Sequence, residues 1–213
     1  MDAQPRFDPA ALRLIAITDS LRDGIPGLVE RARQAVAGGA TMLQLRLADE
    51  PPRTLVEVAR ALRSAVPDVL LIVNERADVA LAGGAHGVHV NVDGVPPSAL
   101  RRFVPAGFII GASVGDEAEC GRARDADYVG IGPVFAAPGN TSGDKALGAD
   151  RFAEIARRCA VPAVAIGGIT TGNVAALKDA GAVGVAVISA LFSSADPTRA
   201  ARDLRAALDA SGS

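Results

Sequence analysis

The stretch VPAVAIGGITTGNVAALKDAGAVGVAVISALF, residues 161–192, decides the fold. It contains two short apolar runs, and each run ends in small residues that leave backbone amides accessible. In a barrel of eight alternating strands and helices, the loops after the last two strands commonly form a phosphate site, and a helix N-terminus adds partial positive charge. We therefore expect Gly167 and Gly168 to let a phosphate approach the main chain, with further amides from Ile188 and Ser189.

Similar apolar runs recur along the rest of the chain, each followed by apolar residues at helical spacing. The runs are short and rich in β-branched residues, as buried parallel strands are. Predicted strands cover residues 14–19, 42–47, 70–75, 88–91, 109–114 and 128–132. Predicted helices cover residues 27–37, 51–62, 78–81, 116–124, 150–159 and 196–208, with another that starts at Pro96 and Pro97.

Together with the opening stretch, this pattern predicts an α/β fold, a single (β/α)8 TIM barrel over residues 1–213, in which residues 1–12 form an N-terminal extension. An open, doubly wound sheet is the alternative. It is disfavoured because no GxGxxG motif follows the first predicted strand.

Composition narrows the classes of function and location. Hydrophobic residues make up 49% of the chain, which is enough apolar material for a large core. The net charge of −2 gives no basic field for binding nucleic acid. Cys120 and Cys159 are too few for a disulfide framework, so we expect reduced, buried thiols. With neither a signal sequence nor an apolar run of membrane-spanning length, we expect a cytoplasmic protein without a membrane partner.

Polar residues at the C-terminal ends of barrel strands form the active-site mouth of this fold. The candidates are Asp19, Gln44, Arg46, Asn74, Glu75, His89, Asn91, Asp93 and Ser113, followed by Asn140, Thr141, Ser142, Asp144 and Lys145. The last five belong to residues 136–148, the longest stretch without periodicity, which we interpret as a functional lid.

Several of these candidates have two readings. Gln44 and Arg46 lie two residues apart in a strand and share a face, so Arg46 either binds an anionic ligand or pairs with Glu75. Asn74 either contacts a ligand or caps the strand-to-helix corner. Glu75 and Asp93 together could hold Mg²⁺. His89 is the first candidate for a general base near neutral pH, with a structural role as the alternative.

The chain resembles the thiamin phosphate synthases. The segments QLR, NERADVAL, GVHV, IIGASV, DYVGIGPVF, AIGGI and AVISALF occur in the same order and spacing as in that family. The resemblance implies a (β/α)8 barrel, a homodimer, and an enzyme that joins an aminopyrimidine pyrophosphate to a thiazole phosphate with Mg²⁺. It also implies that Gly168, Ile188 and Ser189 hold the phosphate group of the thiazole.

The departures from the family pattern fall on the pyrophosphate and metal side. The synthase pattern Gln-x-Arg-x-Lys has its Lys at Ala48, and the second metal carboxylate falls at Gly94, beside Asp93. The Asn-Asp pair of the family is Asn74-Glu75 here. The Thr-x-Thr-Lys loop reads APGN at residues 137–140, unless Thr141, Ser142 and Lys145 substitute for its hydroxyls and ammonium.

This pattern of loss favours a thiazole tautomerase, an isomerase of the same superfamily that needs a bound phosphate and an acid/base group but no metal or other cofactor. The tautomerase carries a His where this chain has Pro133, so the catalytic candidates are His89, Glu75 and Asp93. The expected substrate is a small-molecule phosphate, bound by Gln44, Arg46, Asn74, Ser113, Asn140, Thr141, Ser142, Gly167, Gly168, Ile188 and Ser189.

Two alternatives stay open. The first is a synthase, in which Glu75 and Asp93 would hold Mg²⁺. The second is a catalytically lapsed binding or regulatory homologue that has kept the barrel and the phosphate site.

Overall fold

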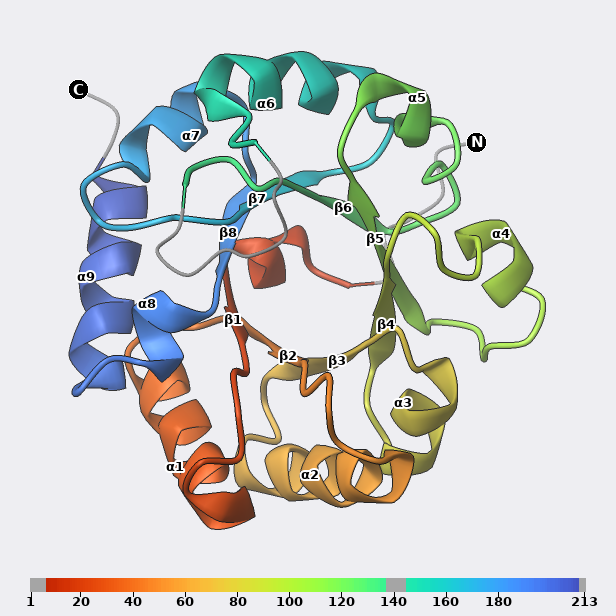
Figure 1. Ribbon diagram of the computed structural model, residues 1–213, viewed down its shortest axis with the longest axis vertical. Coiled ribbons are helices and arrows are strands. Elements are labelled where there is room, and N and C mark those ends of the chain that lie inside the picture. Colours follow the sequence, from red (N-terminus) through yellow and green to blue (C-terminus); the bar gives the residue numbers. More distant parts are fainter. Residues whose placement is uncertain (1–6, 137–144, 211–213) are drawn as a thin grey trace.

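The computed structural model describes residues 7–136 and 145–210, and eight parallel strands in it close into one barrel. Neighbouring strands follow the chain order, and β8 pairs with β1 to complete the ring. The predicted (β/α)8 TIM barrel is confirmed, and Figure 1 shows it end-on. The strands are β1 (Leu14–Ile17), β2 (Met42–Leu45), β3 (Leu70–Asn74), β4 (Gly87–Val90), β5 (Ile109–Val114), β6 (Tyr128–Ile131), β7 (Ala163–Ile166) and β8 (Gly184–Val187).

Helices surround the barrel and cover the outer faces of the strands (Figure 1). A short 3-10 helix, η1 (Pro9–Leu12), precedes the first strand. The helices are α1 (Gly24–Ala37), α2 (Pro52–Ala65), α3 (Ala77–Gly83), α4 (Pro97–Leu100), α5 (Glu117–Cys120), α6 (Gly148–Arg158), α7 (Ala175–Asp179), α8 (Ser189–Phe192) and α9 (Pro197–Asp209).

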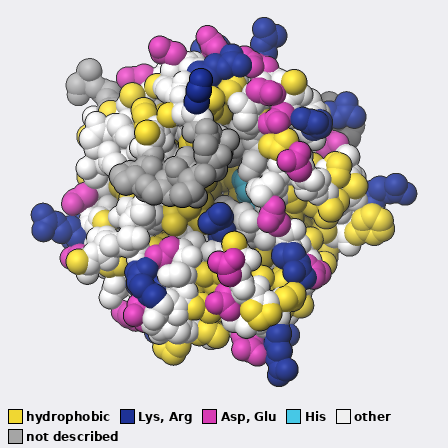
Figure 2. Space-filling view, viewed as in Figure 1, with side chains coloured by type: hydrophobic (Ala, Val, Ile, Leu, Met, Phe, Trp, Pro, Cys, Tyr) yellow, Lys and Arg dark blue, Asp and Glu magenta, His cyan; other side chains and the backbone are white. Residues whose placement is uncertain are grey.

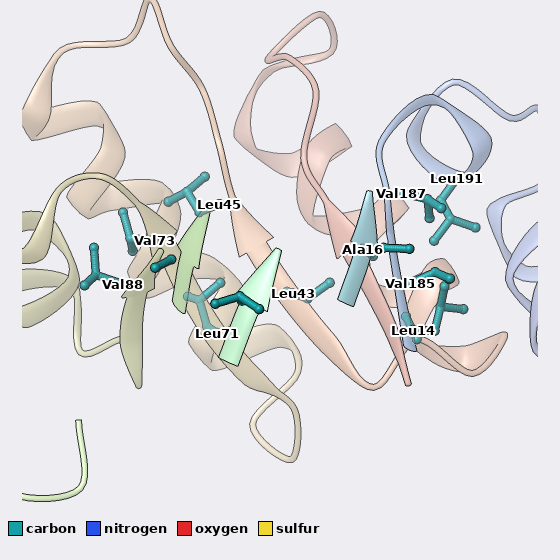
Figure 3. Close-up of a cluster of buried hydrophobic side chains, with 14 of the residues drawn as sticks. Leu14, Ala16, Leu43, Leu45, Leu71, Val73, Val88, Val185, Val187 and Leu191 are labelled. Atoms are coloured by element: carbon teal, nitrogen blue, oxygen red, sulfur yellow. The ribbon is translucent and has the colours of Figure 1, made fainter. Parts of the chain in front are cut away.

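Alternation along the strands creates two separate apolar clusters. In β1, Leu14 and Ala16 point outward into a layer between strands and helices (Figure 3), whereas Ile15 and Ile17 point into the barrel. All four strand residues are at most 1% exposed. Burying a side chain of this kind stabilises the fold by about 1.5–3 kcal/mol, so these two layers hold the strand ends in place.

The N-terminal end of the barrel is closed by η1. The Asp8 side chain caps this turn by accepting a hydrogen bond from the Ala10 amide at 2.9 Å. Leu12 is fully buried in the interior cluster together with Ile15, and Phe7 packs against that cluster. Residues 7–12, expected as part of an extension, therefore contribute to the core. No helix in residues 7–136 and 145–210 combines the length and the apolar character needed to cross a membrane.

Two helical segments differ from the prediction. Residues 116–124 were expected to be one helix, but α5 is a single turn that starts after Asp116, whose side chain accepts from the Glu119 amide at 3.1 Å. Gly121 follows this turn, and glycine is a poor helix former. The short α8 was not predicted, because its four residues are too few to show a helical period.

The expectation of reduced thiols is wrong, since the structure joins Cys120 and Cys159 in a disulfide. Their Cα atoms are 4.9 Å apart, although the residues are separated by 39 positions in the sequence. Cys120 ends α5 and Cys159 caps α6, and these two consecutive helices lie side by side on the outside of the barrel (Figure 1). Sequence separation alone gives no indication of such a contact.

Candidate active site

Two of the cavities at the C-terminal ends of the strands, at the mouth of the barrel, contain predicted site residues. The first, which we call the glycine cavity, has a volume of about 300 Å³ and lies between the loops after β7 and β8. The second, the arginine cavity, has a volume of about 230 Å³ and lies at the ends of β2, β3 and β4. Figure 2 shows the molecule end-on, with charged side chains of both signs around its centre.

The glycine cavity is shaped by two consecutive left-handed glycines. Gly167 has φ 94° and Gly168 has φ 64°, a region that L side chains rarely adopt. A Cβ atom on Gly167 would lie 2.7 Å from the Cα of Pro133, and one on Gly168 would lie 2.4 Å from the backbone oxygen of Phe135. Only glycine fits at either position, so the main chain here is bare toward the cavity.

The carbonyl groups of this turn are bound to other parts of the protein. The Gly167 oxygen accepts from the Phe135 amide at 3.1 Å, and the Gly168 oxygen accepts from Asn173 Nδ2 at 2.9 Å. Asn173 Oδ1 in turn accepts from the Thr170 amide at 2.8 Å. Because the negative ends of these peptide dipoles are engaged away from the cavity, the turn suits an anion. The cavity lining comprises Ala136, Ile166, Gly167, Gly168, Ile169, Thr170, Ala186, Val187, Ile188, Ser189 and Ala190.

The arginine cavity brings together predicted site residues from three strands. Arg46, Asn74 and Glu75 all line it, and so do Arg76 and Asn91. The Arg46 side chain is exposed and has no ion pair within the described residues. The predicted alternative, a salt bridge between Arg46 and Glu75, is therefore absent from the described residues. A guanidinium group without a carboxylate partner beside a cavity suits an anionic ligand.

Gln44 supports this cavity from below. It lies in β2 with only 5% of its surface exposed, and its Nε2 donates to Asn74 Oδ1 at 3.0 Å. A buried amide needs such a partner, and the bond fixes the Asn74 side chain at the end of β3. Arg76 forms a two-pronged ion pair with Asp78, and this hydrogen bonding lowers the pKa of the Asp78 carboxyl. Asp78 therefore holds Arg76 at the edge of the cavity.

The two carboxylates predicted for a metal do not share a cavity. Glu75 lines the arginine cavity, whereas Asp93 is exposed and is not part of its lining. Within residues 7–136 and 145–210, no three His, Cys, Asp or Glu side chains form a metal cluster. Mg²⁺ needs only one or two protein carboxylates, because substrate oxygens and water complete its shell. Glu75, beside the amide oxygen of Asn74, fits that requirement.

His89 lies inside the barrel and not at its surface. It is 7% exposed, its Nδ1 is 3.1 Å from the Tyr128 hydroxyl, and its Nε2 is 3.1 Å from Ser113 Oγ. Burial lowers the pKa of His89 to about 4, so the ring is neutral at pH 7. Burial likewise raises the pKa of Tyr128. With both ring nitrogens engaged by the protein, His89 has no free nitrogen for a substrate.

We expect the buried His89 to make the protein sensitive to acid. The unfolded chain takes up a proton at this residue near pH 6.5, whereas the folded chain does so only near pH 4. Stability therefore falls as the pH drops through this window, by roughly 3 kcal/mol at 1.36 kcal/mol per pKa unit. Urea unfolding at pH 7 and pH 4.5 should show this loss for the wild type and a smaller loss for His89→Gln. Equal losses in both proteins would contradict the assignment.

Other predicted residues have mixed outcomes. Ser113, near the end of β5, contacts His89 and lies 3.5 Å from Asn91 Oδ1. Asn140, Thr141 and Ser142 lie outside the described residues, and Lys145, where the description resumes, is exposed. Sequence reasoning gave no role to Tyr128. The signal was the alternation in β6, which directs Tyr128 into the barrel.

Comparison with known proteins identifies close relatives. A family model described as thiamine monophosphate synthase matches residues 14–191. A thiamine-phosphate synthase from Methanoculleus marisnigri is 48% identical over 178 residues, which cover 82% of this chain and 84% of the relative. One from Azorhizobium caulinodans is 41% identical over 95% of this chain and 98% of the relative. A solved structure, thiamine phosphate pyrophosphorylase from Pyrococcus furiosus, superposes with a TM-score of 0.84 at 34% identity, covering 95% of this chain and 98% of the other.

These relatives overturn the expectation of a thiazole tautomerase, because proteins up to 48% identical over most of the chain are named as synthases. The isomerase prediction is wrong. It relied on the departures at Ala48, at Gly94 and at residues 137–140 to infer that the pyrophosphate and metal side was lost. Arg46 and Arg76 nevertheless line the arginine cavity beside Ala48.

Proposed function

The chain belongs to the thiamine monophosphate synthase family, and from this premise we propose that it is a thiamine-phosphate synthase. This transferase would join an aminopyrimidine pyrophosphate to a thiazole phosphate. The bond from the pyrimidine methylene carbon to the pyrophosphate oxygen breaks, the thiazole nitrogen bonds to that carbon, and pyrophosphate leaves. The observation that carries the proposal is the presence of two anion-suited cavities at one mouth, of about 300 Å³ and 230 Å³.

The glycine cavity would hold the monophosphate of the thiazole. The left-handed turn at Gly167 and Gly168 offers a bare main chain, and its carbonyl groups are engaged elsewhere. The loop after β8 adds Ile188 and Ser189 to the same lining. Neutral backbone amide groups would hold a phosphate at this position, so this part of the site needs no positively charged side chain.

The arginine cavity would hold the pyrophosphate. Its leaving oxygen gains negative charge as the bond breaks, and a missing electrostatic donor at such a point typically costs about 3–4 kcal/mol in the transition state. The Arg46 guanidinium, which has no ion pair among the described residues, lines this cavity and can meet that charge. Asn74, fixed by Gln44, adds a directed amide. Mg²⁺, when bound at Glu75, would supply Lewis-acid stabilisation of the pyrophosphate oxygens. Thr141, Ser142 and Lys145 remain predicted contributors.

The test is product formation from both substrates. Protein incubated with the aminopyrimidine pyrophosphate, the thiazole phosphate and saturating Mg²⁺ should form thiamin phosphate and pyrophosphate in equal amounts. Omitting either substrate, or removing Mg²⁺ with a chelator, should stop the reaction. No product under the complete conditions would reject the synthase, and calorimetry with thiazole phosphate would then show whether a lapsed binding protein remains.

A cytoplasmic location and a homodimer remain predictions of this proposal. The second is checked by sedimentation of the purified protein, where a single species of twice the chain mass of 21.6 kDa is expected.

A further inference from the structure

Five side chains form a continuous line of hydrogen bonds from the barrel interior to its mouth. The Tyr128 hydroxyl is 3.1 Å from His89 Nδ1, and His89 Nε2 is 3.1 Å from Ser113 Oγ. Ser113 Oγ is 3.5 Å from Asn91 Oδ1, and Asn91 Nδ2 donates to Glu75 Oε1 in a short bond. The line thus crosses from β6 to the corner after β3.

Its direction follows from the group at its end. A carboxylate can only accept, so Asn91 must present its NH₂ group to Glu75 and its amide oxygen to Ser113. The Ser113 hydroxyl then donates to Asn91, which leaves its oxygen free to accept from His89. His89 must therefore carry its proton on Nε2, and its unprotonated Nδ1 accepts the Tyr128 hydroxyl proton. Every donor in the line points toward the carboxylate.

The interior of the barrel has room for both rings. His89, Gly111 and Tyr128 lie opposite one another in β4, β5 and β6. A Cβ atom on Gly111 would lie 2.5 Å from His89 Nδ1 and 2.3 Å from Tyr128 Cζ. Any larger residue at Gly111 would separate the rings and break the line at its start.

Glu75 is also held by its backbone, which is an independent observation. Its φ of 59° is the one positive value outside glycine among the described residues. Such a conformation is unfavourable for an L residue and persists only where neighbours determine it. Here the Glu75 amide donates to the His89 carbonyl oxygen at 2.7 Å. Both the main chain and the side chain of Glu75 are therefore fixed to β4.

An unrestrained carboxylate in this place would find a different partner. Glu75 lines the same cavity as Arg46 and Arg76, and a flexible glutamate would pair with either guanidinium group. Among the described residues it pairs with neither: Arg76 is paired with Asp78, and Asn91 donates to Glu75 Oε1. The hydrogen bond from Asn91 thus keeps Glu75 away from Arg46, which can bind an anion. The second oxygen of the Glu75 carboxylate can bind a cation.

We propose that Asn91 is a positioning residue, which holds Glu75 in place as the last acceptor of a one-way hydrogen-bond line from Tyr128 and thereby fixes His89 as the Nε2–H tautomer. The mechanistic part rests on the proposed function, because Glu75 is positioned for Mg²⁺ and pyrophosphate. The tautomer of His89 does not depend on that function and can be measured separately.

The primary test is the imidazole ¹⁵N spectrum of the full chain, which has only two histidines. Wild-type His89 should be the neutral Nε2–H tautomer. In Asn91→Ala the Ser113 hydroxyl loses its acceptor and turns to His89, so the Nδ1–H tautomer should gain population. His86 serves as an internal reference, since its Nδ1 accepts from the Leu71 amide at 2.9 Å in both proteins. Ser98→Ala, on the exposed surface of α4, should leave the spectrum unchanged.

The second test is calorimetry of Mg²⁺ in the presence of inorganic pyrophosphate. Asn91→Ala should weaken binding about tenfold, because Glu75 then loses the donor that holds it. In assays of product formation, kcat should fall while the KM for thiazole phosphate stays unchanged. An Nδ1–H tautomer in the wild type, or a spectrum unaffected by Asn91→Ala, would overturn the proposal. Absence of product with the tautomer result intact would reject the synthase alone.

Discussion

Gly168→Asp is expected to weaken binding of thiazole phosphate at least a hundredfold. A side chain here would meet the Phe135 backbone oxygen at 2.4 Å, so the turn has to move. The new carboxylate would also repel the phosphate. Losing two hydrogen bonds to a charged group costs about 3–4 kcal/mol, which corresponds to a factor of a hundred or more. Calorimetry with thiazole phosphate measures the effect.

Gly181→Asp is the matched control for this variant. Gly181 also has a positive φ, 89°, but a Cβ atom there meets nothing within 4 Å. It precedes β8, at the opposite end of the barrel from the glycine cavity. Both variants place an aspartate at a positive φ and add the same charge, but only Gly168→Asp meets a backbone atom, so urea unfolding should show the larger loss of stability for Gly168→Asp. Equal affinity of Gly168→Asp and Gly181→Asp for the thiazole phosphate would refute the phosphate site.

Glu75→Gln should lower kcat about 10²–10³-fold, the usual effect of removing one electrostatic contact to a transition state. The substitution keeps the shape of the side chain but removes the charge that Mg²⁺ prefers. The apparent affinity for Mg²⁺ should fall with kcat, whereas binding of thiazole phosphate in the separate glycine cavity should be retained. Initial rates across a Mg²⁺ titration give both quantities.

Glu50→Gln controls for charge alone. Glu50 lines the same cavity and the substitution removes the same charge, but among the described residues no hydrogen bond joins its side chain to the ends of β3 and β4. We expect a loss of less than tenfold. Similar losses in both variants would indicate that the net charge of the cavity matters and that Glu75 is not a specific ligand.

The barrel could be predicted from the sequence because its strands are buried on both faces. Runs such as residues 70–73 and 109–114 are mostly apolar and include β-branched residues, and glycine pairs mark two helix ends. Short helices were less accessible. Four residues such as those of α8 carry no period, and the limits of α5 depend on one aspartate cap and one glycine.

The part of the candidate site that a single loop forms could be predicted from the sequence. Gly167 and Gly168 signal a bare turn by their identity alone. Contacts that join distant strands could not be predicted in the same way. The amide of Asn91 meets the Glu75 carboxylate only because β3 and β4 are neighbours, and no spacing in the chain encodes which atom faces which. The absence of the family's lysine at Ala48 led to a wrong prediction for the same reason. Ala48 follows β2, whereas Arg76 follows β3 and lines the same arginine cavity.

The closure of the barrel by η1 has a consequence for how ligands enter and leave the protein. Among the described residues, Leu12 and the interior cluster fill the axis at the N-terminal end. In the proposed synthase, both substrates and both products would therefore pass through the same mouth of the barrel. A product that lingers there blocks the next turnover, and the rate of departure, as much as the chemistry, sets how fast the protein can cycle.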